Sequence, residues 1–171
     1  MRNRLLGEEH PATIRAMGIL AGTYRSQGKY ADAEKLQIKV LDMTNRLFGE
    51  DHPNTIRAMG GLAATYGELG KYAAAEKLQI KVLDMRNRLL GEEHPDTMDA
   101  MGDLAETFNY LQKYTDAARL GVQVVDVRKK IFGEEHPKTA EAVALLAQIR
   151  SQPKTNTSGT ESKKKGESYL L

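Results

Sequence analysis

The chain has no cysteine among its 171 residues. Disulfide bonds and thiolate metal sites are therefore excluded, and a reducing compartment suits such a protein best. Long apolar runs are also missing, since none approaches the roughly 20 residues that a membrane-spanning helix needs. The opening residues, MRNRLLGEEH, lack the apolar core of a signal peptide. We therefore expect a cytoplasmic protein that does not cross a membrane.

Most of the chain also lacks an excess of charge of either sign. The net charge is +2, and residues 151–171 account for it with four lysines against two glutamates. The remaining body holds 21 basic and 21 acidic residues in mixed order. A nucleic-acid-binding surface needs a basic patch that can neutralise phosphates. We therefore expect no nucleic-acid partner for this body.

What the sequence does have is a repeat of 42 residues. Residues 49–90 read GEDHPNTIRAMGGLAATYGELGKYAAAEKLQIKVLDMRNRLL, and 32 of these 42 positions are identical in residues 7–48. Residues 91–132 share 19 of the 42 positions, and a fourth copy begins at Gly133. A chain of this kind is a repeat array, in which each unit contacts only its neighbours.

Each full unit predicts two helices. In the first copy, Pro11 to Gln27 carries apolar residues at helical spacing and has proline at its first position, where no N–H is needed. Gly28 ends this helix, and a second is predicted over about Tyr30 to Phe48. The links GEEH and GEDH between units are short, and short links join antiparallel helices. The result is a stack of helical hairpins.

The last copy stops after one helix, predicted over Pro137 to about Ser151. Arg150 stands where earlier copies have an aromatic residue, which is typical of a solvated terminal cap. Beyond it the sequence is rich in Ser, Thr, Gly and Lys, a composition that predicts disorder. MRNRLL at the start matches the end of a second helix, which indicates a fragment of a longer array. The predicted divisions are 1–6 (remnant of a preceding repeat helix), 7–48, 49–90 and 91–132 (repeats), 133–151 (capping helix) and 152–171 (disordered tail).

The large and small residues of each unit form one spaced set that resembles the tetratricopeptide repeat. In the first copy the set is Met17, Leu20, Ala21, Tyr24, Gly28, Tyr30, Ala33 and Val40. The unit is 8 residues longer than the usual repeat of 34. With its GEEHP and GEDHP links and the string GKYADAEKLQIKVLDM, it resembles the repeat of kinesin light chains, and also the array attached to NB-ARC (STAND) signalling NTPases. The resemblance covers residues 7–151 and implies an all-α fold, a right-handed α-solenoid of antiparallel helix pairs with about 3.5 units.

The resemblance also implies a function. It predicts a non-catalytic protein–protein interaction module, similar to kinesin light chains, that binds a peptide or helix of a partner protein in a concave groove. The alternative is a fragment of the ligand-sensing array of an NB-ARC/STAND signalling NTPase. In kinesin light chains, paired asparagines of the first helix hold the backbone of a cargo peptide. Here the matching pairs contain glycine, isoleucine or aspartate in place of asparagine, at residues 18–19, 60–61 and 102–103.

The same analogy assigns a set of residues to the concave face. We expect this face to be basic at Arg15 and Arg57 and acidic on the third repeat, so that it prefers a partner with the reverse order of charges. Glycine inside a helix costs roughly 1 kcal/mol relative to alanine. The glycines of this face therefore reflect either close helix packing or drift between copies on the one hand, or a wide, shallow groove on the other. The predicted partner-binding residues are Arg15, Gly18, Gly22, Arg25, Arg57, Gly60, Ala64, Asp99, Asp103, Glu106 and Asn109.

No catalytic, cofactor or metal site is predicted. One histidine recurs in each unit, as His10, His52, His94 and His136. Stacked units hold such residues about 10 Å apart, whereas two imidazoles on one zinc must each come within about 2.1 Å of it. We therefore interpret each histidine as part of a His-Pro link that starts a helix.

An apolar end face is predicted on the first helix, around Met17, Leu20 and Tyr24. The helix that would cover these residues is missing from the partial first unit. We therefore expect end-to-end self-association of the array.

Overall fold

The computed structural model describes Gly7 and residues 9–152, and its regular structure there is helical. No strand occurs in this part of the chain, so the all-α prediction is confirmed. The predicted helix remnant at 1–6 and the predicted tail after Gln152 lie outside the described residues. The helices are α1 (Pro11–Ser26), α2 (Tyr30–Phe48), α3 (Pro53–Glu68), α4 (Tyr72–Leu90), α5 (Pro95–Tyr110), α6 (Tyr114–Phe132) and α7 (Pro137–Arg150).

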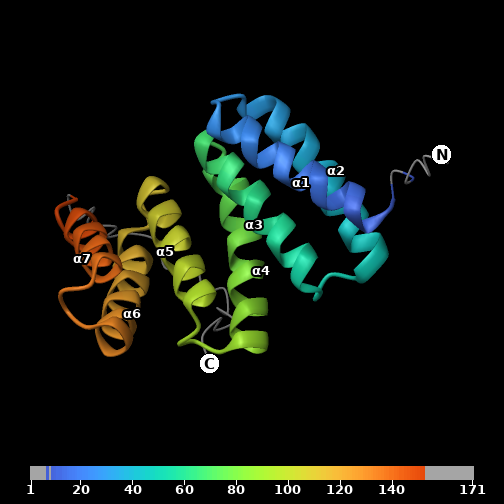
Figure 1. Cartoon of the computed structure of the whole chain (residues 1–171). Helices are drawn as coiled ribbons and strands as arrows, with labels where there is room; N and C mark the ends of the chain where they lie inside the picture. Colours follow the sequence, from blue (N-terminus) through green and yellow to red (C-terminus); the bar gives the residue numbers. More distant parts are fainter. Residues whose placement is uncertain (1–6, 8, 153–171) are drawn as a thin grey trace, which may run out of the picture.

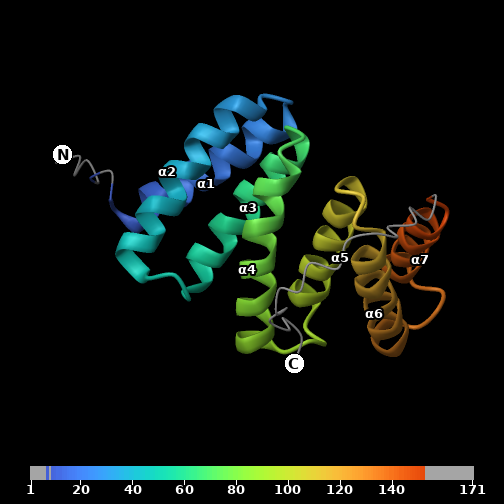
Figure 2. The ribbon, with the colours of Figure 1, turned by 180° about the vertical axis from the view of Figure 1, so that it is seen from behind.

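The helices stack in chain order as antiparallel neighbours, which confirms the predicted solenoid of helix pairs. Each packs on the helix before it and the helix after it. The odd-numbered helices also contact one another, α1 with α3, α3 with α5 and α5 with α7, whereas the described even-numbered helices do not. Helices on the inside of a curve lie closer together than those on the outside. The row therefore curves with α1, α3, α5 and α7 on its concave side (Figure 1 and, from behind, Figure 2).

A histidine caps the start of every odd-numbered helix. In α3, Pro53 occupies the first turn and Nδ1 of His52 accepts a hydrogen bond from the backbone N–H of Asn54 at 3.1 Å. The same bond occurs at α1, α5 and α7, with N–Nδ1 distances of 3.1 to 3.2 Å. It satisfies one of the backbone N–H groups that the first helical turn leaves unpaired. The interpretation of the His-Pro link as a helix start is therefore confirmed.

The buried core runs through the array but thins at α1. Leu62 and Leu104 are each 3% exposed, whereas Leu20, the corresponding residue of α1, is 43% exposed because no described helix packs in front of it. Met17 and Tyr24 of the predicted end face are half-buried. An apolar side chain is thus exposed at this end, and the self-association itself stays a prediction.

The last helix packs on α6 through its buried side chains Leu146 and Ile149. Gly121 of α6 permits this approach, since a Cβ there would lie 3.1 Å from Cδ1 of Leu146. Arg150, the predicted cap residue, is exposed. Within the described residues, no helix combines the length and the apolar content that crossing a membrane requires.

Candidate partner-binding groove

The predicted concave residues all lie on α1, α3 and α5, the helices on the inside of the curve. Their exposure differs along the array. Asn109 is buried, and its Oδ1 has no hydrogen-bond partner among the described residues. The exposed members are Arg15, Gly18, Arg57, Asp103 and Glu106, and the half-buried ones are Gly22, Arg25, Gly60, Ala64 and Asp99.

A pocket of about 300 Å³ opens on this side of the array. It is lined by residues of α3, α4 and α5 and by one arginine of α1. Five predicted residues meet here: Arg25, Arg57, Gly60, Ala64 and Asp103. The other six predicted residues do not line it: Arg15, Gly18, Gly22, Asp99, Glu106 and Asn109.

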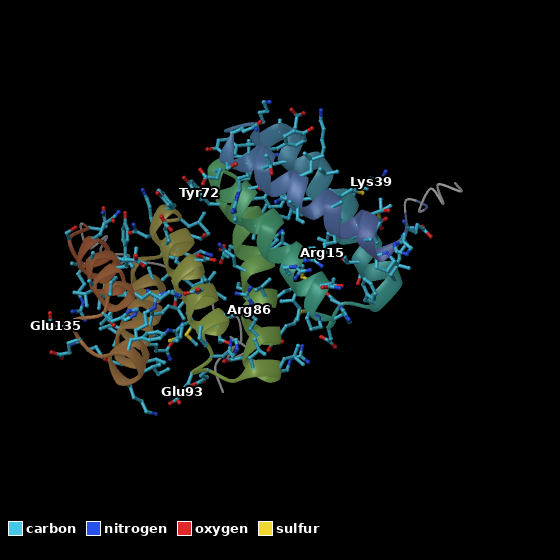
Figure 3. All side chains as sticks on the ribbon, in the orientation of Figure 1. Arg15, Lys39, Tyr72, Arg86, Glu93 and Glu135 are labelled. Carbon is cyan, nitrogen blue, oxygen red and sulfur yellow. The ribbon has the colours of Figure 1, made fainter. Side chains whose placement is uncertain are left out.

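Three residues of α4, Gln79, Val82 and Arg86, also line the pocket and were missed by the sequence reasoning. The analogy placed only the first helix of each repeat on the concave face. In the structure, residues of α4 also reach the pocket surface between α3 and α5. A signal was present at Arg86. Thr44 occupies the matching position of the first copy, in a string that is otherwise identical over KLQIKVLDM and NRL. Figure 3 labels Arg86 on α4.

Two of the pocket's arginines are oriented by hydrogen bonds. Arg86 donates from Nη1 to the backbone carbonyl of Asp96 at 2.6 Å, which also fixes the start of α5 to α4. Arg57 donates from Nη2 to Oδ1 of Asn54 at 2.9 Å. A guanidinium has five N–H donors, so both retain donors for a ligand. Arg25 forms no ion pair within the described residues.

Asp103 is the acidic residue of the pocket. Surrounding protein removes part of the water from its carboxylate, although the side chain still reaches solvent, and this desolvation raises its pKa above the ordinary 3.8. Repulsion from Asp99 and Glu106 raises the pKa further, while Arg86 and Arg25 lower it. The two arginines thus act on Asp103 from different helices.

The chemistry of the pocket is that of a binding site. Its arginines donate hydrogen bonds that suit carboxylates and carbonyl oxygens. Gln79 donates from Nε2 to the carbonyl of Asp103 at 3.4 Å, while its buried Oε1 has no partner among the described residues. Within the described part of the chain, no group of three His, Cys, Asp or Glu side chains could hold a metal ion.

Comparison with solved structures supports the geometry. Two crystal structures from Podosopora anserina, of a protein assigned to the kinesin light chains with nearly identical TPR-like repeats, match with TM-scores of 0.76 and 0.75. Each is 25% identical and aligns 85% of this chain with 69% of its own. BtubC (BKLC) from P. vanneervenii has a TM-score of 0.67 at 16% identity, covering 93% of this chain and 70% of its own, and supports the fold alone.

Comparison of sequences gives the family. No curated protein matches this sequence. The family model described as the tetratricopeptide repeat matches residues 19–88 and 63–130, which together span more than half of the chain. The predicted kinesin light chain-like repeat is confirmed by this match and by the solved structures. The chain belongs to the tetratricopeptide repeat family.

Proposed function

We propose that the array is a non-catalytic docking module that binds an extended segment or a helix of a partner protein along its concave face. The observation that carries the proposal is the pocket of about 300 Å³ where arginines from α1, α3 and α4 meet. Members of the repeat family generally act as protein-binding scaffolds, and the solved relatives include a protein assigned to the kinesin light chains. The absence of cysteine fits a cytoplasmic location of the array itself.

The charges of the concave face set the kind of segment that fits. Basic groups lie on α1, α3 and α4, with Arg25 and Arg57 beside the pocket. Acidic groups lie on α5, where Asp103 and Glu106 are exposed. A partner segment with acidic side chains toward α1 and basic side chains toward α5 would therefore bind in one direction only, because the reversed direction brings like charges together.

The test is affinity capture with three forms of the full chain, read by quantitative mass spectrometry. The groove variant is Arg25→Glu with Arg57→Glu, and the matched control is Lys35→Glu with Lys77→Glu. Both lysines are exposed on α2 and α4, outside the pocket, and the two pairs change the net charge equally. We expect the groove variant to lose about tenfold or more of its captured partner, since reversing two contacting charges costs more than 1.4 kcal/mol. Equal recovery by both variants would contradict the groove.

End-to-end self-association is the second part of the proposal. Ile19 and Leu20 of α1 are 63% and 43% exposed at one end of the described array. Burying such side chains against another copy would gain roughly 25 cal/mol per Å² of apolar surface. Light scattering after size exclusion, at rising concentration, should show a larger mass that Leu20→Lys abolishes. A constant monomer mass would contradict it.

A further inference from the structure

Tyr110, which is exposed, and Tyr72, which is half-buried, form an aromatic pair at the edge of the array. Tyr72 opens α4 and Tyr110 closes α5, and their rings stack with centroids 4.5 Å apart and planes 6° apart. Figure 3 labels Tyr72 at the edge opposite to Glu93. Tyr110 is 53% exposed although it is a large aromatic residue. The matching residues of the other copies are Ser26 and Glu68, so this stack occurs once in the described array.

Two carboxylates act on the phenol of Tyr110. Glu106 lies one helical turn before it on α5, and Glu68 ends the neighbouring helix α3. Their negative charges, that of Glu106 first, raise the pKa of Tyr110. Both carboxylates are exposed, and neither forms an ion pair within the described residues. The patch therefore combines an exposed aromatic side chain with two unpaired negative charges.

The array itself shows what such a combination binds. Lys71 lies over the ring of Tyr66 at 5.6 Å and pairs with Glu34, with Nζ 2.6 Å from Oε1. Lys113 repeats the arrangement one unit later, over Phe108 at 5.5 Å and paired with Glu76. In both cases an ammonium lies between an aromatic face and a carboxylate, which is the geometry of a cation–π contact with a charge partner. No described lysine or arginine occupies that position at Tyr110.

We propose that the lysine run Lys163–Lys165 docks on the patch formed by Tyr72, Tyr110, Glu68 and Glu106. The described chain ends at Gln152, just beyond α7, and this residue corresponds to Tyr110 one repeat later. The ends of α5 and α7 lie at the same edge of the array (Figure 1). Charge complementarity then favours the lysines, since this segment carries three positive charges in succession.

The length of the intervening chain permits the contact. Lys163 follows Gln152 by 11 residues, which can span at most about 36 to 40 Å. Neighbouring packed helices such as α5 and α7 lie only about 8 to 10 Å apart. Because the lysines are tethered, their effective concentration at the patch is in the millimolar range, which lets a weak contact be populated. The contact does not require any partner protein, so its test is independent of the test of the proposed function.

Paramagnetic NMR tests the docking on the full chain. Since the protein has no cysteine, Ser162→Cys provides a single site for a nitroxide label beside the lysines. We expect the label to broaden the amide signals of Tyr72, Glu106 and Tyr110 more strongly than those of α2. Changing all three lysines to glutamine should lower the docking constant about fivefold or more, because the cation–π and charge contacts are both lost.

Matched variants separate the patch from general charge effects. Glu68→Gln with Glu106→Gln should reduce the broadening at Tyr110, whereas Glu92→Gln with Asp126→Asn, two exposed carboxylates elsewhere, should leave it unchanged. At a concentration where light scattering gives a monomer, a mixture of labelled chains without ¹⁵N and unlabelled ¹⁵N chains should show no broadening at Tyr110. Broadening in that mixture would assign the contact to a second copy and overturn docking within one chain. Broadening that is absent from α5, or that is undiminished when the three lysines are changed to glutamine, would overturn it as well.

Discussion

Arg128 of α6 donates from Nη2 to Oδ1 of Asp99 on α5, at 2.9 Å. Its Nη1 donates to the backbone carbonyl of Lys138 on α7 at 2.7 Å, so one side chain joins three successive helices. The Arg128 side chain is only 10% exposed. Arg86, one repeat earlier, makes the corresponding carbonyl bond to Asp96, and Thr44 bonds within its own helix. The junctions between repeats are therefore tied more firmly toward α7.

The first prediction concerns this tie. Arg128→Ala should lower the free energy of unfolding by about 2 to 3 kcal/mol, since hydrogen bonds to charged groups contribute about 1.5 to 3 kcal/mol. Because repeats are coupled mainly to their neighbours, amide hydrogen exchange should accelerate in α7 and stay unchanged in α1. Arg86→Ala, which removes a single bond from a more exposed arginine, is the comparison and should cost less. Equal exchange in α7 for both variants would refute the special role of Arg128.

The second prediction concerns the histidine caps. His94→Ala should destabilise the array by about 1 kcal/mol, the usual value for a lost N-cap acceptor. His94→Asn should stay within a few tenths of a kcal/mol of the wild type, because asparagine is itself a good cap. Urea unfolding followed by circular dichroism measures both. If the asparagine variant unfolds as early as the alanine variant, the Nδ1 bond to Asp96 is not what stabilises this helix start.

A difference among the caps provides the control. The ring of His52 also stacks on Phe48, four residues earlier, with ring centroids 4.6 Å apart. Four residues before His94 stands Leu90, so His94 has no such aromatic partner. His52→Asn should therefore lose the stacking and cost more than His94→Asn, by about 0.5 to 1.5 kcal/mol.

The sequence allowed the helices and their order to be predicted because those features depend on local signals. Proline, histidine and glycine recur at fixed positions of the repeat and set the helix ends, and α2 has the predicted bounds. The α1 helix ends at Ser26, one residue before the predicted Gln27, since a helix end frays by a residue or so. A 42-residue period also requires each unit to repeat the packing of the last.

The pocket could be predicted only in part, because it depends on curvature and not on local pattern. The accessibility of α4 side chains between α3 and α5 depends on the angle between neighbouring repeats. No single residue determines that angle. Arg86 and Gln79 were missed for that reason. The burial of Asn109 likewise depends on the packing of its neighbours. The predicted concave set contained five of the lining residues, but their convergence on one pocket needed the structure.

The third prediction concerns the raised pKa of Asp103. In the folded state this carboxyl binds a proton more readily than in the unfolded chain, so its contribution to stability is unfavourable above the folded pKa. The unfavourable contribution is relieved as the pH falls through that value toward the ordinary 3.8. Asp103→Asn should therefore raise the melting temperature slightly at pH 7, and this advantage should fade as the pH falls through the raised folded pKa and be gone by about pH 4. The effect is small because the side chain still reaches solvent.

Arg25→Ala is the companion measurement. Arg25 lowers the pKa of Asp103, so its removal should raise that pKa further, as read from the carboxyl ¹³C shift during a pH titration. An unchanged titration would show that Arg25 does not act on the pocket, which would also weaken the proposed groove.

The fourth prediction concerns the glycines of the concave face that have no neighbouring atom close to them. A Cβ at Gly18, Gly22 or Gly60 would meet no atom within 4 Å, so close helix packing does not explain glycine at these positions. Alanine there should stabilise each helix by about 0.5 to 1 kcal/mol. Gly121→Ala is the control and should gain less or lose stability, since its Cβ would come 3.1 Å from Leu146.

A variant with alanine at all three of these glycines distinguishes the two explanations of them, a wide binding groove and drift between copies. If the concave face binds a partner over a wide, shallow floor, three added methyl groups should raise stability and at the same time reduce the partner captured by the array. Stabilisation with undiminished capture would instead mean that the glycines persist through drift between copies. Loss of binding without stabilisation would contradict both readings, because an exposed helical glycine costs stability by its backbone entropy whatever the groove does.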